Sequence, residues 1–110
     1  MSIEVCELLY EFDRLENIIR NSMMPKEWEI IRGVNIVKEI IEQINPEEIT
    51  NEFKDSVEIA IIEYKKRLQS QMKVLDSYVD YGISRAVKVV EQMINFKDLK
   101  YENNLVKIRR

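Results

Sequence analysis

The chain has 110 residues, of which 45% are hydrophobic and 34% charged, and its 17 basic and 20 acidic side chains give a net charge of −3. This hydrophobic fraction argues against an intrinsically disordered chain, and the length suits one domain with its own core. Two glycines and two prolines are too few for the turns of an all-β fold, so the composition favours an all-α protein.

The first predicted helix covers residues 3–21, with Ser2 as its N-cap. Its apolar residues recur at spacings of 3, 4, 3 and 4, which is the period of one helical face. They are Val5, Leu8, Phe12, Leu15 and Ile19. Cys6 lies beside this face, where we expect a small, partly buried side chain. As the chain's one cysteine, it excludes an internal disulfide and fits a reducing compartment.

A second amphipathic helix is predicted over residues 26–44, since Pro25 suits the start of a helix. Its apolar face consists of Trp28, Ile31, Val34, Val37, Ile41 and Ile44. Gly33 interrupts this pattern, and glycine inside a helix costs up to about 1 kcal/mol relative to alanine. We therefore expect Gly33 to mark a close approach of the first helix.

The third predicted helix is the longest, at residues 46–96. Asn45, Pro46 and Glu48 have the pattern of an N-cap, a first helical residue and a capping box. The apolar residues that follow keep spacings of 3 and 4 throughout. They are Phe53, Val57, Ile61, Tyr64, Leu68, Met72, Leu75, Val79, Ile83, Ala86, Val90 and Ile94.

Gly82 leaves two alternatives for this helix, because glycine commonly ends helices. Either the helix is continuous and Gly82 lies at a close crossing or a mild bend, or residues 84–96 form a fourth helix that folds back. The unbroken spacing from Val79 to Ile83 favours the continuous helix. In both cases we expect an all-α helical bundle.

A short C-terminal β-hairpin is predicted at about residues 98–109. A turn at Asn103-Asn104 would pair Tyr101 with Val106 and Leu99 with Ile108, and asparagine tolerates the positive φ that such a turn needs. Residues 97–110 also carry five basic and two acidic groups. We therefore divide the chain into a bundle domain, 1–96, and a basic C-terminal hairpin or tail, 97–110.

A helix of 51 residues would be about 76 Å long, longer than two shorter helices can cover. Part of its apolar stripe would be exposed, and exposed stripes of that size mark interaction surfaces. A second copy is the simplest cover, so we predict a homodimer or larger homo-oligomer. The predicted interface residues are Leu75, Val79, Ile83, Ala86, Val90 and Ile94.

Two other functions have candidate residues. Glu39, Glu42, Glu52 and Asp55 form ExxE followed by ExxD, which resembles the Mg²⁺-binding motif of all-α nucleoside triphosphate pyrophosphohydrolases of the MazG type. The gap between the two pairs is shorter than that family uses. The resemblance implies metal-dependent pyrophosphate release.

The other alternative is a nucleic-acid-associated factor, because basic groups near Tyr101 could contact phosphates. The candidates are Lys97, Lys100, Lys107, Arg109 and Arg110.

The sequence contains no histidine, the commonest general base and metal ligand. It also lacks a glycine-rich phosphate loop, a signal-peptide core, and an apolar run of about 20 residues that could span a membrane. We therefore expect a soluble, cytoplasmic, non-enzymatic protein-interaction module, such as a small helical subunit, adaptor or inhibitor. We expect no catalytic residue, metal site or cofactor, and a protein partner besides the second copy.

Overall fold

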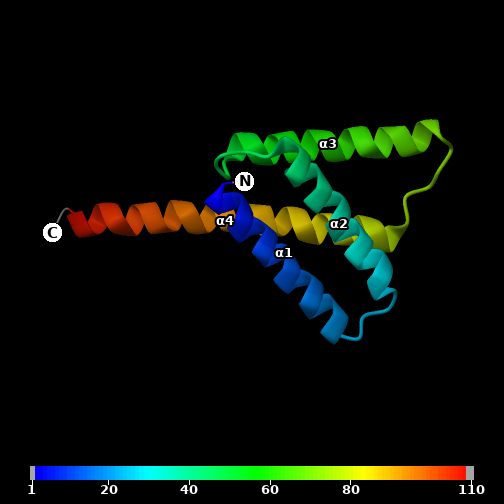
Figure 1. Cartoon of the computed structure of the whole chain (residues 1–110), viewed down its shortest axis with the longest axis horizontal. Helices are drawn as coiled ribbons and strands as arrows, with labels where there is room; N and C mark the ends of the chain where they lie inside the picture. The colour runs from blue at the N-terminus through cyan, green and yellow to red at the C-terminus, as the bar shows by residue number, and fades with distance from the viewer. Residues whose placement is uncertain (1, 109–110) are drawn as a thin grey trace.

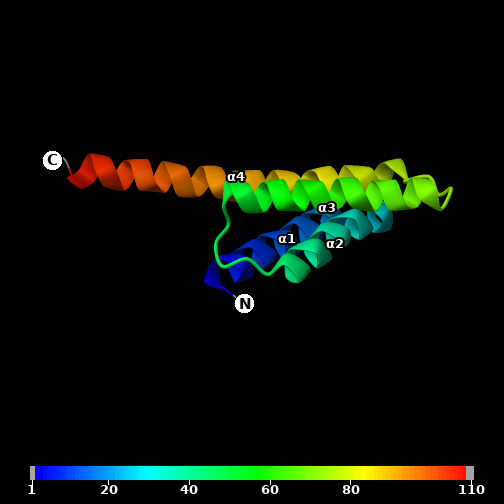
Figure 2. The ribbon, with the colours of Figure 1, turned by 90° about the horizontal axis from the view of Figure 1, so that it is seen from above.

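The computed structural model describes the backbone of residues 2–108 and the side chains of residues 2–99. Four helices follow one another: α1 (Ile3–Asn21), α2 (Glu27–Ile44), α3 (Asn51–Ser70) and α4 (Ser77–Ile108). The first two helices form one antiparallel hairpin and the last two another, and the hairpins pack in two layers (Figures 1 and 2). The predicted all-α class is confirmed, with the helices arranged as a bundle.

The periodic apolar faces of all four helices meet in one core. The predicted face of α1 is buried throughout, and the Ser2 hydroxyl accepts a hydrogen bond from the Val5 N–H at 3.2 Å, as an N-cap does. Between α2 and α3, Ile49 adds a further buried side chain. The core therefore contains residues from every helix and from one connection.

The predicted start of the third helix is wrong. Asn45 has a φ of 46° and its N–H donates to the Ile41 carbonyl, so it ends α2. Asparagine is one of the few residues that tolerate this left-handed conformation. Helix α3 begins at Asn51, five residues after the predicted start at Pro46, and the Thr50 hydroxyl caps it by accepting a hydrogen bond from the Phe53 N–H at 3.1 Å.

The predicted helix over residues 46–96 is also interrupted, at residues 71–76 and not at Gly82. Met72 has a φ of 56° and is 95% exposed, although the periodic pattern placed it in the core stripe. The Asp76 carboxylate then accepts hydrogen bonds from the N–H groups of Tyr78 and Val79, at 2.8 and 3.3 Å. These bonds cap a new helix, and α4 runs antiparallel to α3 after the turn (Figure 1).

Gly82 lies inside α4 and does not end a helix. It lies at a close crossing with α2, which is one of the two roles predicted for a glycine inside a continuous helix. A Cβ added at Gly82 would overlap the Ile30 carbonyl oxygen and lie 3.1 Å from the Gly33 Cα. A Cβ added at Gly33 would overlap the Val79 carbonyl oxygen. Gly33 therefore marks an approach of α4, and the prediction that it meets the first helix is wrong.

The C-terminal end of α4 extends beyond the other three helices (Figures 1 and 2). The structure measures 59 × 32 × 21 Å, and its radius of gyration is 15.9 Å, against about 13 Å for a compact chain of this length. Because α4 is helical to Ile108, the hairpin predicted at 98–109 is not found, and residues 2–108 contain no strand. The proposed domain boundary after residue 96 falls within this helix.

Candidate interaction groove between α1 and α4

The predicted interface residues lie within the core of the single chain. Val79, Ile83, Ala86, Val90 and Ile94 are each at most 5% exposed, and Leu75 packs against the same core. The most extensive helix contact in the structure joins α2 and α4. The prediction that this apolar stripe is exposed in a single chain is therefore wrong. The turn at residues 71–76 folds α4 back into the bundle, where α2 packs against it. Self-association itself stays a prediction and needs another surface.

The structure has such a surface in an open groove of about 980 Å³ between α1 and α4. We call it the α1–α4 groove. Its exposed apolar side chains include Ile3 (79% exposed), Tyr10 (63%) and Phe96 (62%). Its lining residues are Ile3, Glu4, Cys6, Glu7, Tyr10 and Glu11 from α1, and Val89, Gln92, Met93, Phe96 and Lys97 from α4.

Helical spacing explains why these side chains form two facing ridges. Ile3 and Tyr10 are seven residues apart on α1, next to the buried face that contains Val5 and Phe12. On α4, Val89, Met93 and Phe96 have spacings of 4 and 3 and lie one or two positions from the buried Val90 and Ile94. Val89 and Met93 are partly buried against the core, whereas Ile3, Tyr10 and Phe96 are exposed. Each helix therefore has apolar side chains beside its buried face, and these line one groove.

The groove is acidic along α1. Three of its lining residues are the carboxylates Glu4, Glu7 and Glu11, against the single basic residue Lys97. Glu11 pairs with Arg14 at 3.3 Å. Within the described part of the chain, the exposed Glu7 carboxylate has no ion pair or hydrogen bond. An apolar floor with an acidic rim suits an amphipathic binding partner that has basic groups.

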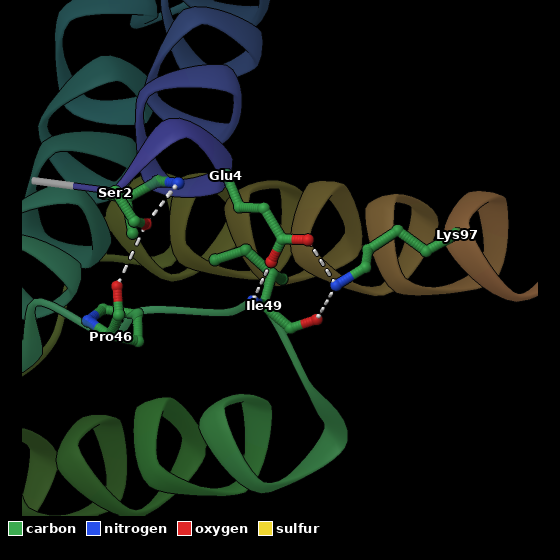
Figure 3. A network of polar contacts seen from close by, with 6 residues as sticks. Ser2, Glu4, Pro46, Ile49 and Lys97 are labelled. Carbon is green, nitrogen blue, oxygen red and sulfur yellow. Dashed lines mark hydrogen bonds and ion pairs between the residues drawn. The ribbon is translucent and has the colours of Figure 1, made fainter.

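A polar network fixes one end of the groove, as Figure 3 shows. Lys97 Nζ lies 2.7 Å from one oxygen of Glu4 and donates a hydrogen bond of 3.1 Å to the carbonyl of Ile49. The Ile49 N–H donates to the other oxygen of Glu4 at 2.6 Å. Nearby, the Ser2 hydroxyl donates to the Pro46 carbonyl at 3.2 Å. These bonds join the start of α1, the α2–α3 connection and α4.

The same network lowers the pKa of Glu4 from its ordinary value of 4.5. The hydrogen bond from Lys97 is the largest cause, followed by the hydrogen bond from the Ile49 N–H, and desolvation opposes both. Lys97, which the sequence predicted as a nucleic-acid contact, instead bonds to Glu4 and to the Ile49 carbonyl within the bundle. The other nucleic-acid candidates lie outside the described part of the chain: this holds for the side chains of Lys100 and Lys107, and for all of Arg109 and Arg110.

The carboxylates of the pyrophosphohydrolase-like motif do not form a common site. Glu39, Glu42, Glu52 and Asp55 are all exposed. Among residues with described side chains, no three His, Cys, Asp or Glu lie close enough to hold a metal ion together. In the same part of the chain, no helix has both the length and the apolar character needed to cross a bilayer.

The α1–α4 groove was not predicted from the sequence. Cys6, predicted to be partly buried, is exposed on the groove wall. A signal was present in residues 87–96, where Val89, Met93 and Phe96 widen the apolar arc beyond the core stripe. In comparisons with protein-family models, curated protein sequences and solved structures, the chain has no significant match.

Proposed function

We propose that this protein is a non-enzymatic, cytoplasmic protein-interaction module that self-associates and binds an amphipathic helix in the α1–α4 groove. The proposal rests on one observation: the side chains of Ile3 and Tyr10 on α1 and of Phe96 on α4 are exposed and line the same groove. Large contiguous apolar patches are rare on proteins that act alone and are typical of binding surfaces.

The shape of the groove favours a helix as the bound element. Two helices that present apolar side chains at spacings of 3, 4 and 7 leave a channel for the apolar face of a third helix, as in other helix-in-groove complexes. The acidic residues of α1 would then pair with basic groups at the edge of the bound helix. Because affinity in such complexes comes mainly from a few buried aromatic and aliphatic side chains, we expect Tyr10 and Phe96 to contribute most.

The structure contains a second groove of about 450 Å³ between α3 and α4. Its lining includes four charged residues of both signs, Glu58, Lys65, Lys88 and Glu91. Lys65 and Glu91 already form ion pairs across the two helices, with Asp80 at 3.0 Å and Lys54 at 3.1 Å. This groove is smaller than the α1–α4 groove, and charged residues make up more of its lining, so we prefer the α1–α4 groove.

The proposal is tested by capturing binding proteins from the source cells with tagged chain and identifying them by quantitative mass spectrometry. The groove variant is Ile3→Glu with Tyr10→Glu. The matched control is Ile59→Glu with Ile62→Glu on α3, where both isoleucines are also more than half exposed. We expect the groove variant, and not the control, to lose at least 90% of specifically captured protein, untagged copies of this chain included. Equal capture by both variants would contradict the proposal.

A further inference from the structure

The C-terminal end of α4 has the residue types, charge and length that the α1–α4 groove requires. We infer that residues 100–110 of a second copy of this chain occupy the groove, and that the exchange is reciprocal. This inference rests on the proposed function, because it names the helix that the groove binds.

The residue types along α4 support this assignment. Ile94 is the last buried side chain of α4 among those described, and Phe96 and Leu99 beyond it are 62% and 58% exposed. In the sequence, Tyr101, Leu105 and Ile108 then follow at spacings of 4 and 3, and the backbone is helical to Ile108. This is the pattern of a helix with one apolar face. The bundle to which α4 belongs ends before this segment, as Figure 1 shows.

Charge distinguishes this occupant from an arbitrary amphipathic helix. Residues 100–110 contain four basic groups and one acidic group, a net charge of +3. The groove contains three carboxylates and one lysine. The chain is therefore basic at the end that extends away from the bundle and acidic where the groove is open. Such complementarity favours the pairing and sets its orientation.

Length and symmetry are also consistent with a reciprocal exchange. If two α4 helices run antiparallel about a twofold axis near Asp98, residues 100–107 of one copy lie beside residues 89–96 of the other. The latter stretch contains Val89, Met93 and Phe96 of the groove. Each stretch is about 12 Å long at 1.5 Å per residue. A twofold dimer forms the contact twice, and the extended ends of both helices are covered.

Cys6 provides a direct test, because it is the chain's one cysteine, is exposed and lines the groove. Unlabelled chain carrying a benzophenone maleimide on Cys6 is mixed with ¹⁵N-labelled chain, irradiated and analysed by mass spectrometry. We expect most cross-links to join Cys6 to residues 100–110 of the other isotopic copy. A Cys6→Ser, Ile59→Cys chain, with the probe on the exposed face of α3, should give at least tenfold fewer cross-links to that segment.

A chain ending at Leu99 is the second arm of the test. It retains every buried residue of the described core, so its helical circular dichroism should persist while intermolecular cross-linking from Cys6 falls at least tenfold. Cross-links confined to one copy, or directed to other segments, would overturn the inference. If this inference fails but the Ile3→Glu, Tyr10→Glu variant no longer captures some other protein, the proposed function still holds. If that variant captures every protein as well as the unmodified chain does, both proposals fail.

Discussion

The carboxylate of Glu4 on α1 and the ammonium of Lys97 on α4 lie 2.7 Å apart at the end of the α1–α4 groove, close to where α4 leaves the bundle. Both groups also bond to the backbone of Ile49, so three separate parts of the chain meet at one ion pair (Figure 3). This contact sets how the two walls of the groove are placed at that end.

Glu4→Gln should therefore destabilise the fold at neutral pH by about 1 kcal/mol, since it removes the charge that pairs with Lys97 from a partly exposed site. Urea unfolding measures the change. Glu7→Gln is the matched control on the same helix, and it should change the free energy of unfolding by less than about 0.5 kcal/mol.

The stabilisation from Glu4 should depend on pH in a defined direction. Its folded pKa is lowered from 4.5, so ionised Glu4 stabilises the fold above pH 4.5, and the contribution is lost as the pH falls through the folded pKa. The stability difference between the unmodified chain and Glu4→Gln should shrink steadily below pH 4.5. A difference that stays constant down to pH 2.5 would mean that the ion pair adds nothing to stability.

Gly82→Ala should destabilise the protein by about 2 kcal/mol or more, because the new Cβ would overlap the backbone carbonyl of Ile30. The sign is informative, since alanine in an uncrowded helix would instead stabilise by up to about 1 kcal/mol. Thermal unfolding followed by circular dichroism measures the change. Ser84→Ala, at an exposed position two residues along α4, should be neutral or slightly stabilising. A stabilising Gly82→Ala would show that α2 and α4 do not cross closely there.

Met72→Gly tests the connection between α3 and α4. Met72 is 95% exposed and has a positive φ, which glycine adopts without the cost that other residues bear. We expect stabilisation by about 0.5 kcal/mol, measured by urea unfolding, whereas Lys66→Gly at an exposed position inside α3 should cost about 1 kcal/mol. If Met72→Gly is as costly as Lys66→Gly, the helix continues through residue 72.

The proposal also predicts no nucleotide hydrolysis. Incubated with nucleoside triphosphates and Mg²⁺, the pure chain should release pyrophosphate no faster than Glu42→Ala, because the four motif carboxylates are exposed and form no common cluster with other potential ligands in the described residues. A coupled pyrophosphate assay measures the rate. Turnover that Glu42→Ala abolishes would restore the pyrophosphohydrolase alternative.

Most of the apolar helix faces and the end of α2 at Ile44 could be predicted from the sequence, whereas the start of α3 and the turn between α3 and α4 could not. In the predicted face of α2, Trp28 is 65% exposed and Ile44 is 37% exposed. The faces follow from spacings of 3 and 4, which burial enforces. The turn between α3 and α4 contains no glycine or proline, and its Met72 and Leu75 keep the spacing of the stripe. Because that turn was missed, residues such as Val79 and Ile83 were assigned to an interface when they fill the core. The groove depends on how α1 and α4 meet, which no single-helix pattern specifies.

The oligomeric state in solution tests the central claim most directly. Sedimentation equilibrium at about 10–100 µM, where an association of micromolar affinity is populated, should give about twice the chain mass of 13.2 kDa. Ile3→Glu with Tyr10→Glu should give a folded monomer, and Ile59→Glu with Ile62→Glu should remain a dimer. A monomer of 13.2 kDa for the unmodified chain at the highest concentration, or a groove variant that still dimerises, would contradict the assignment of the α1–α4 groove as the surface that a second copy covers.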